Sequence, residues 1–182
     1  MDAMTPAERE RLTNSLSETR RRLLETVQSL SPAQLDYKSG PDRWSAAQIV
    51  EHLAIVEGFI LIRTDATLKS PEPKPSAWQG RDDALIETIR NRESRVQASE
   101  RVRPAGQLRH EELLRQFDAA RGRVIDFVAT TNAPLRSFCS PHPLFGDLDC
   151  YQWLLFTAAH CERHHAQILE VMSDANFPRP AV

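Results

Sequence analysis

Apolar residues recur at steps of three and four along four long segments of the chain, which is the spacing of one face of an α-helix. The first segment opens with Thr5 as a hydroxyl cap, Pro6 in the first turn and Glu8 three residues after the cap, a combination typical of a helix start. We expect this helix to end near Ser31, where a shorter helical turn begins. Its predicted apolar side consists of Leu12, Leu16, Leu23, Leu24, Val27 and Leu30.

Three further long helices are predicted, over residues 46–68, 110–131 and 150–174. Ser45 and Gln48 form a capping box at the start of the first of these. Asp149 is an acidic N-cap with Gln152 at the third helical position of the last one. Each helix therefore has a start signal or a clear apolar side of its own.

The segments between these helices are predicted as connections. Residues 70–80 hold three prolines, residues 84–96 are expected to form a short helix or an ordered excursion, and residues 133–148 are predicted as loop. No alternating strand pattern of useful length and no internal repeat is present. We therefore predict an all-α fold: one domain over residues 1–182, a four-helix bundle with long connections and a short extra helix.

Histidines interrupt the apolar faces of two of these helices. On the last helix, His160 and His164 share one face with Trp153, Thr157, Ile168 and Val171. Their Cβ atoms should lie about 5–6 Å apart on successive turns. On the second long helix, His52 is the titratable residue of a face otherwise formed by Ile49, Leu53, Val56, Phe59 and Ile60. Facing helices of a bundle build metal sites in this way, so the pattern predicts one at His52, His160 and His164.

Simpler interpretations exist for each part of this pattern. A single histidine on an apolar face is usually a core residue bonded to a carbonyl, and an H-x3-H pair is only moderately specific for metal. Three buried imidazoles without an acidic partner would cost on the order of 1–3 kcal/mol for each unsatisfied group. A divalent cation removes that cost, so we favour the metal site.

Composition excludes several other classes of function. Charged residues make up 26% of the chain and the formal net charge is −2, which gives no positive field for nucleic acid. We also expect no membrane span and no secretory signal, because the apolar stretches are short and interrupted. Three cysteines without CxxC spacing favour a reducing cytoplasm over a disulfide scaffold.

The same motifs resemble those of the DinB-like superfamily, in particular its second branch. The similarity rests on Trp44-Ser45 at a helix start, His52 within EHL, the stretch HPLFGDL, and a final motif in which Arg163 and Gln167 accompany the histidine pair. The resemblance implies an up-down-down-up bundle, a divalent metal held by His52, His160 and His164, and often a homodimer. Some relatives are S-transferases or isomerases that use a low-molecular-weight bacterial thiol, and others are described as metal-dependent hydrolases.

Three neutral protein ligands leave coordination positions of a divalent ion open. Our leading hypothesis is therefore a metal-dependent enzyme that activates a thiol cosubstrate or water for attack on a small-molecule substrate. Zinc and nickel both suit imidazole ligands. The alternatives are a metal-dependent ligand-binding or stress-response protein without turnover, and a metal that only stabilises the bundle.

Residues near the predicted site have less definite roles. Gln167, the candidate catalytic residue, either orients a ligand or donates to a bound oxygen, or it is simply a helix-flank amide, and the sequence leaves these interpretations open. Trp44 is expected to pack the helix entrance rather than to wall the site. His142 could reach the mouth of the pocket, but we favour a loop histidine without a role, and we interpret Arg163 as a surface arginine in a salt bridge. Cys161 should point about 100° away from the ligand face.

Overall fold

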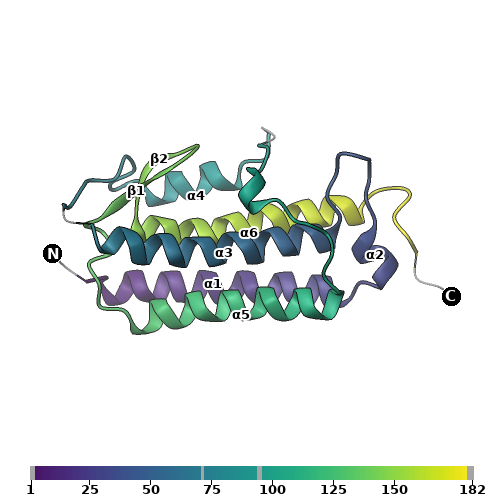
Figure 1. Cartoon of the computed structure of the whole chain (residues 1–182), viewed down its shortest axis with the longest axis horizontal. Coiled ribbons are helices and arrows are strands. Elements are labelled where there is room, and N and C mark those ends of the chain that lie inside the picture. The colour runs from purple at the N-terminus through teal and green to yellow at the C-terminus, as the bar shows by residue number, and fades with distance from the viewer. Residues whose placement is uncertain (1–2, 71, 94–95, 180–182) are drawn as a thin grey trace.

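The computed structural model describes residues 3–70, 72–93 and 96–179 and confirms the predicted all-α bundle (Figure 1). In chain order, its elements are α1 (Pro6–Gln28), α2 (Pro32–Asp36), α3 (Ala46–Leu68), α4 (Asp82–Arg90), the 3-10 helix η1 (Glu100–Val102), α5 (His110–Thr130), β1 (Cys139–His142), β2 (Gly146–Asp149) and α6 (Cys150–Met172). The bundle is formed by α1, α3, α5 and α6, while the other elements belong to its connections.

The helix starts follow the capping chemistry of the sequence. Reciprocal capping boxes are present at Thr5, Ser31, Ser45 and Asp149, where each cap side chain accepts from a backbone N–H and the third helical residue bonds back. Each such cap stabilises its helix by about 1 kcal/mol. The start of α5 differs, because its N-cap, Arg109, makes no capping bond through its side chain.

Cross-helix contacts define the directions of the four helices. Tyr151 near the start of α6 donates to the carbonyl of Glu8 near the start of α1, and His165 near the end of α6 meets Thr26 near the end of α1. These two helices are therefore parallel, whereas α3 and α5 run the opposite way (Figure 1). This is the up-down-down-up order that the resemblance implied. Because α3 and α5 are parallel, the chain between them must return along the bundle, and this return carries α4 and η1.

Apolar side chains of all four long helices fill the core, with one ion pair among them. Arg121 of α5 and Glu57 of α3 are 0% and 1% exposed, with a closest approach of 2.6 Å. Arg121 also donates to the carbonyl of Leu16 and the hydroxyl of Thr19 on α1. Glu57 is thus paired inside the core and is not free to act as a base in the cavity.

The prediction of a loop over residues 133–148 is wrong in part, because this segment contains a short β-hairpin. Strands β1 and β2 pair antiparallel, with Cys139 opposite Asp149 and His142 opposite Gly146, which has a φ of +70°. Each strand has four residues and Pro141 lies within β1, so the segment is too short and irregular to show alternation. The hairpin fixes the position of His142 relative to α6.

No helix in the described part of the chain combines the length and the apolar character needed to cross a membrane.

Candidate metal centre

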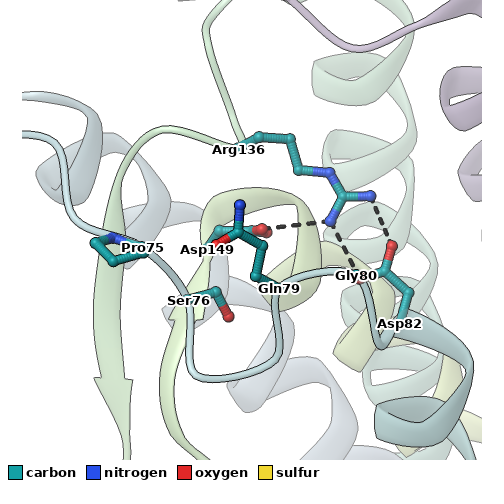
Figure 2. A pocket seen from close by; sticks show the side chains of 7 residues that line it. All are labelled: Pro75, Ser76, Gln79, Gly80, Asp82, Arg136 and Asp149. Atoms are coloured by element: carbon teal, nitrogen blue, oxygen red, sulfur yellow. Dashed lines mark hydrogen bonds and ion pairs between the residues drawn. The ribbon is translucent and has the colours of Figure 1, made fainter.

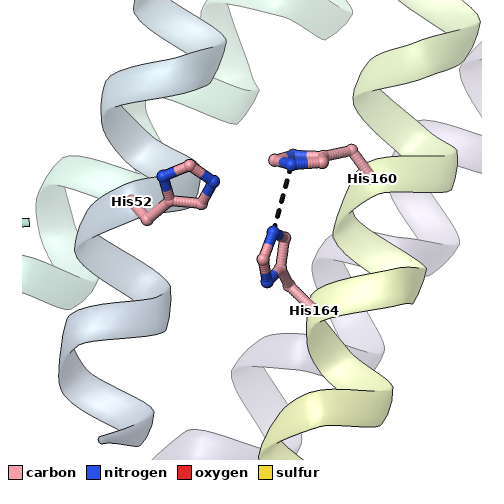
Figure 3. A group of neighbouring side chains, drawn as sticks. All are labelled: His52, His160 and His164. Carbon is pink, nitrogen blue, oxygen red and sulfur yellow. Dashed lines mark hydrogen bonds between the residues drawn. The ribbon is translucent and has the colours of Figure 1, made fainter. Parts of the chain in front are cut away.

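The three predicted histidines meet between α3 and α6 (Figure 3). One ligand atom from each of His52, His160 and His164 lies within 4.8 Å of the other two. The Nε2 atoms of His160 and His164 are 3.1 Å apart. The ring centroid of His52 lies 5.2 Å from that of His160 and 4.9 Å from that of His164. The helical spacing and the antiparallel packing of α3 on α6 therefore produce the predicted convergence.

Hydrogen bonds fix the ring orientation of two of the histidines. The Nδ1 of His52 lies 2.7 Å from the carbonyl oxygen of Val102, and the Nδ1 of His164 lies 2.8 Å from the Oε1 of Gln167. Both oxygens are acceptors, so both Nδ1 atoms carry the proton and each Nε2 keeps its lone pair. This arrangement is typical of histidine ligands, which usually donate their second N–H to an oxygen. Among the open interpretations of Gln167, the structure favours the one in which it orients a ligand.

The environment keeps all three imidazoles neutral at physiological pH. Burial lowers the pKa of His164 to about 3, and the neighbouring His52 adds to this effect. Burial also lowers the pKa of His160 well below its ordinary value, and it lowers that of His52 against the opposing hydrogen bond to Val102. Neutral imidazole is the form that binds metal, so no proton has to leave before a cation binds.

The spacing of the nitrogen atoms fits a divalent metal ion. Zinc–nitrogen bonds are about 2.0–2.1 Å long, so two nitrogens 3.1 Å apart can both bind one ion. Because the proton of His164 is on Nδ1, its Nε2 accepts a hydrogen bond from the Nε2 of His160, and a divalent cation bound by both rings would replace this bond once the proton of His160 moves to its own Nδ1. Among the described residues, the group with metal-ligand geometry is His52, His160 and His164, and it contains no carboxylate.

The segment that follows η1 is tied to α3 next to His52. The carboxylate of Glu51 accepts hydrogen bonds from the backbone N–H groups of Ala105 and Gly106, at 3.1 and 2.8 Å. Gly106 has a φ of +68°, which disfavours any residue with a side chain. Glu51 therefore has a structural role, because it holds the backbone that follows Val102, the residue whose carbonyl meets His52.

The histidines form part of the wall of a cavity of about 1170 Å³. One part of the remaining wall is aromatic and apolar, while charged residues, among them Arg63, Glu87 and Arg163, line other parts. The aromatic and apolar part includes Trp44, Val56, Ile60, Phe145, Trp153 and Phe156. The indole of Trp44 lies 4.9 Å from the ring of His52, between centroids. Trp44 thus walls the site, contrary to the favoured interpretation, and it also packs against the core beside the start of α3.

His142 also lies where the favoured interpretation of the sequence did not place it, because it reaches the cavity. It is 9% exposed and lies in the wall of the same cavity, stacked on Phe145 with ring centroids 4.6 Å apart. Phe156 separates it from the metal centre, with its ring centroid 4.9 Å from that of His142 and 4.8 Å from that of His160. The proline on each side of His142 is a sequence signal for a turn, but a turn alone does not predict that the imidazole lines the cavity.

The neighbours of the two ligands on α6 face other elements. Cys161 is buried against α1, with its Sγ 3.7 Å from the carbonyl oxygen of Thr19, and burial raises its pKa to about 11. His165 meets Thr26 of α1 at 2.8 Å. Arg163 donates to the carbonyls of Ile89 and Asn91 at the end of α4, and it lines the cavity instead of the outer surface. The predicted orientation of Cys161, away from the face that carries His160 and His164, is confirmed.

A smaller cavity of about 300 Å³ lies at the end of the bundle where α6 begins (Figure 2). It contains Arg136, which bonds to Asp82 at 2.6 Å, to Glu8 at 2.7 Å and to Asp149 at 3.3 Å. These contacts join the starts of α1, α4 and α6. We interpret this cluster as structural, since its guanidinium is already surrounded by carboxylates of the chain.

Fold and site together define a four-helix bundle with a three-histidine cluster that could hold a metal. The chain belongs to the DinB superfamily, whose family model matches residues 15–168.

The chain is similar to the uncharacterized protein YuaE of Bacillus subtilis (strain 168), with 24% identity over 151 residues that cover 80% of this chain and 87% of YuaE. Two solved structures share the fold. YfiT from Bacillus subtilis, described as a probable metal-dependent hydrolase with an unusual four-helix bundle topology, superposes with a TM-score of 0.63 and 18% identity, covering 94% of this chain and 90% of YfiT. The four-helix bundle protein TT2238 has a TM-score of 0.54 and 25% identity, covering 89% of this chain and 98% of that one.

Proposed function

We propose that this protein is a metal-dependent enzyme that acts on a small molecule bound in the cavity, with His52, His160 and His164 as the metal ligands. The main support is one geometrical fact: three neutral imidazoles converge at the wall of a cavity large enough for a substrate. The description of YfiT as a probable metal-dependent hydrolase agrees with this proposal.

In such a site, different residues of the chain would hold the metal ion, orient its ligands and line the cavity. A divalent ion, zinc or nickel, supplies the positive charge that lowers the pKa of a bound thiol or water. His52, His160 and His164 would hold the ion, and as neutral ligands they would leave its charge undiminished. Val102 and Gln167 fix the rings of His52 and His164 by accepting their Nδ1 protons. Trp44 and Phe156 pack against the rings of His52 and His160 and cover them on one side.

The size of the cavity favours a thiol cosubstrate as the nucleophile. Small-molecule pockets usually have volumes of about 300–1,000 Å³. The present cavity, at about 1170 Å³, lies above that range and has room for a substrate together with a low-molecular-weight thiol. We therefore favour a transfer reaction to a thiol over simple hydrolysis, because a water nucleophile would occupy little of the cavity.

Turnover by the metal-loaded protein tests the proposal. The protein is loaded with zinc or nickel and incubated with electrophiles in the presence of several bacterial thiols, and separately with ester and amide substrates without thiol. We expect turnover with at least one combination and its loss in His160→Ala. His165→Ala is the matched control, because His165 is the next histidine of the same helix yet faces α1, and it should keep the activity.

A metal-dependent binding protein without turnover is the second candidate. It would retain one metal per chain and bind small molecules in the cavity, but no combination of thiol and electrophile would react. That result would overturn the enzyme proposal. The expected homodimer and cytoplasmic location stay predictions, which light scattering and cell fractionation would test.

A further inference from the structure

His142 presents a hydrogen-bond donor of fixed orientation to the cavity. Its Nδ1 accepts the backbone N–H of Leu144 at 3.1 Å, so the proton of the neutral ring is on Nε2. Burial lowers the pKa of His142 to about 4, which keeps the ring neutral at physiological pH. Contacts with Phe145, Trp153 and Phe156 hold the ring in place. No residue in the described part of the chain accepts a hydrogen bond from this Nε2.

Arg63 places a positive charge beside this donor. Its guanidinium carbon lies 4.8 Å from the ring centroid of Trp153, and its Nη1 donates to the carbonyl of Pro141, the residue before His142. Arg63 lines the same cavity. After burial, its positive charge is the second cause of the lowered pKa of His142. Within the described ranges, no carboxylate lies at ion-pair distance from Arg63.

We infer that Arg63 and His142 form a recognition site for a carboxylate at the end of the cavity away from the metal centre, and that the ligand of this cavity is an apolar small molecule bearing that carboxylate. A guanidinium and a neutral N–H donor together match a carboxylate, which is an acceptor at both oxygens. The neutral ring of His142 cannot form an ion pair with the carboxylate. Its N–H donor instead adds a directional hydrogen bond to the electrostatic attraction of Arg63.

The spacing of the aromatic rings places this carboxylate site in relation to the metal centre. The ring of Phe156 lies between those of His142 and His160, with centroid distances of 4.9 and 4.8 Å. A ligand whose carboxylate meets His142 therefore lays its apolar body across Phe156 and Trp153 and brings its far end toward the histidines. The inference deepens the proposed function by naming a substrate class, but binding at Arg63 and His142 does not require the metal.

A matched pair of ligands tests the inference by calorimetry. The probes are 2-naphthoate and its uncharged analogue 2-naphthamide, titrated into the full chain both after chelator treatment and after zinc loading. In the chelator-treated protein, we expect 2-naphthoate to bind at least about fivefold more tightly, because hydrogen bonds to a charged acceptor are stronger than those to a neutral one. Arg63→Gln and His142→Phe should each lower this ratio toward one.

Two further variants separate recognition from folding. His142→Gln keeps a donor near the position of Nε2 and should restore most of the preference lost in His142→Phe. Arg123→Gln removes an exposed arginine of α5 outside the cavity and should leave the ratio unchanged. Circular dichroism of each variant confirms that the bundle is folded.

The outcomes distinguish this inference from the proposed function. A preference for 2-naphthoate that persists unchanged in both Arg63→Gln and His142→Phe would overturn the carboxylate site. A preference seen only with zinc would assign the carboxylate to the metal and would overturn it as well. If the chelator-treated protein shows the expected pattern while no metal binds to the histidines, the carboxylate site stands and the proposed function fails.

Discussion

Replacing Gln167 with methionine removes the hydrogen-bond acceptor of His164 and keeps a side chain of similar length. Gln167 is half-buried, and its Oε1 lies 2.8 Å from the Nδ1 of His164. Loss of this partner lets the ring turn and lowers the basicity of its Nε2. Such changes behind a ligating histidine weaken metal binding by about 10–100-fold, or roughly 1.4–2.7 kcal/mol.

Replacing Gln167 with glutamate should act in the opposite direction. A carboxylate accepts the Nδ1 proton more strongly than an amide does, so the imidazole becomes a better ligand. We expect Gln167→Glu to bind zinc more tightly than the wild type and Gln167→Met to bind it about tenfold more weakly.

Competition with a chromophoric chelator at constant pH measures these affinities. Gln116→Met is the control, because Gln116 is an exposed glutamine on α5, away from the histidines. If Gln167→Met binds zinc as tightly as the control, or if Gln167→Glu binds it more weakly than Gln167→Met, the assigned role of Gln167 is refuted.

Three further predictions concern Glu51 beside the site, the ion pair in the core and His142 in the cavity wall. Glu51→Gln weakens the attachment of the segment after η1, so it should lower zinc affinity severalfold, measured by the same chelator competition, and zinc affinity equal to that of the wild type would contradict this. Arg121→Met leaves Glu57 buried without its partner and should lower the free energy of unfolding by about 3–5 kcal/mol in urea titrations, whereas the double variant with Glu57→Met should recover most of the loss. His142 has its pKa lowered to about 4, so between pH 6.5 and 4 the unfolded chain binds its proton more readily, and stability falls as the pH drops through this range. The chelator-treated His142→Phe protein should therefore lose less stability than the wild type between these pH values, and an equal loss would argue against a neutral, buried His142.

Local sequence signals predicted the helices and the three histidines of the candidate site. Capping boxes act within four residues, and the spacing of apolar side chains assigns an inward face to each helix, so both are visible in the sequence alone. His52, His160 and His164 lie on such faces, and the antiparallel packing of α3 and α6 brings them together. Family resemblance added the order of the helices, which the apolar pattern does not determine.

The remaining parts of the site depend on contacts between distant residues. The carbonyl of Val102 reaches His52 from a segment 50 residues further along the chain, and no local pattern predicts which backbone oxygen will arrive there. His142 enters the cavity because of the register of a hairpin with four-residue strands, too short for an alternating pattern. The sequence likewise gives no signal for the buried pairing of Arg121 with Glu57, since a charged residue in a helix is normally assigned to the solvent face.

Anomalous diffraction from crystals of the protein grown with zinc tests the central claim most directly. Data collected on both sides of the zinc absorption edge should show one strong peak per chain between α3 and α6, in contact with His52, His160 and His164, and no such peak in crystals of His160→Ala. Zinc bound elsewhere on the chain, or no peak among the three rings at saturating zinc, would contradict a metal centre at this site.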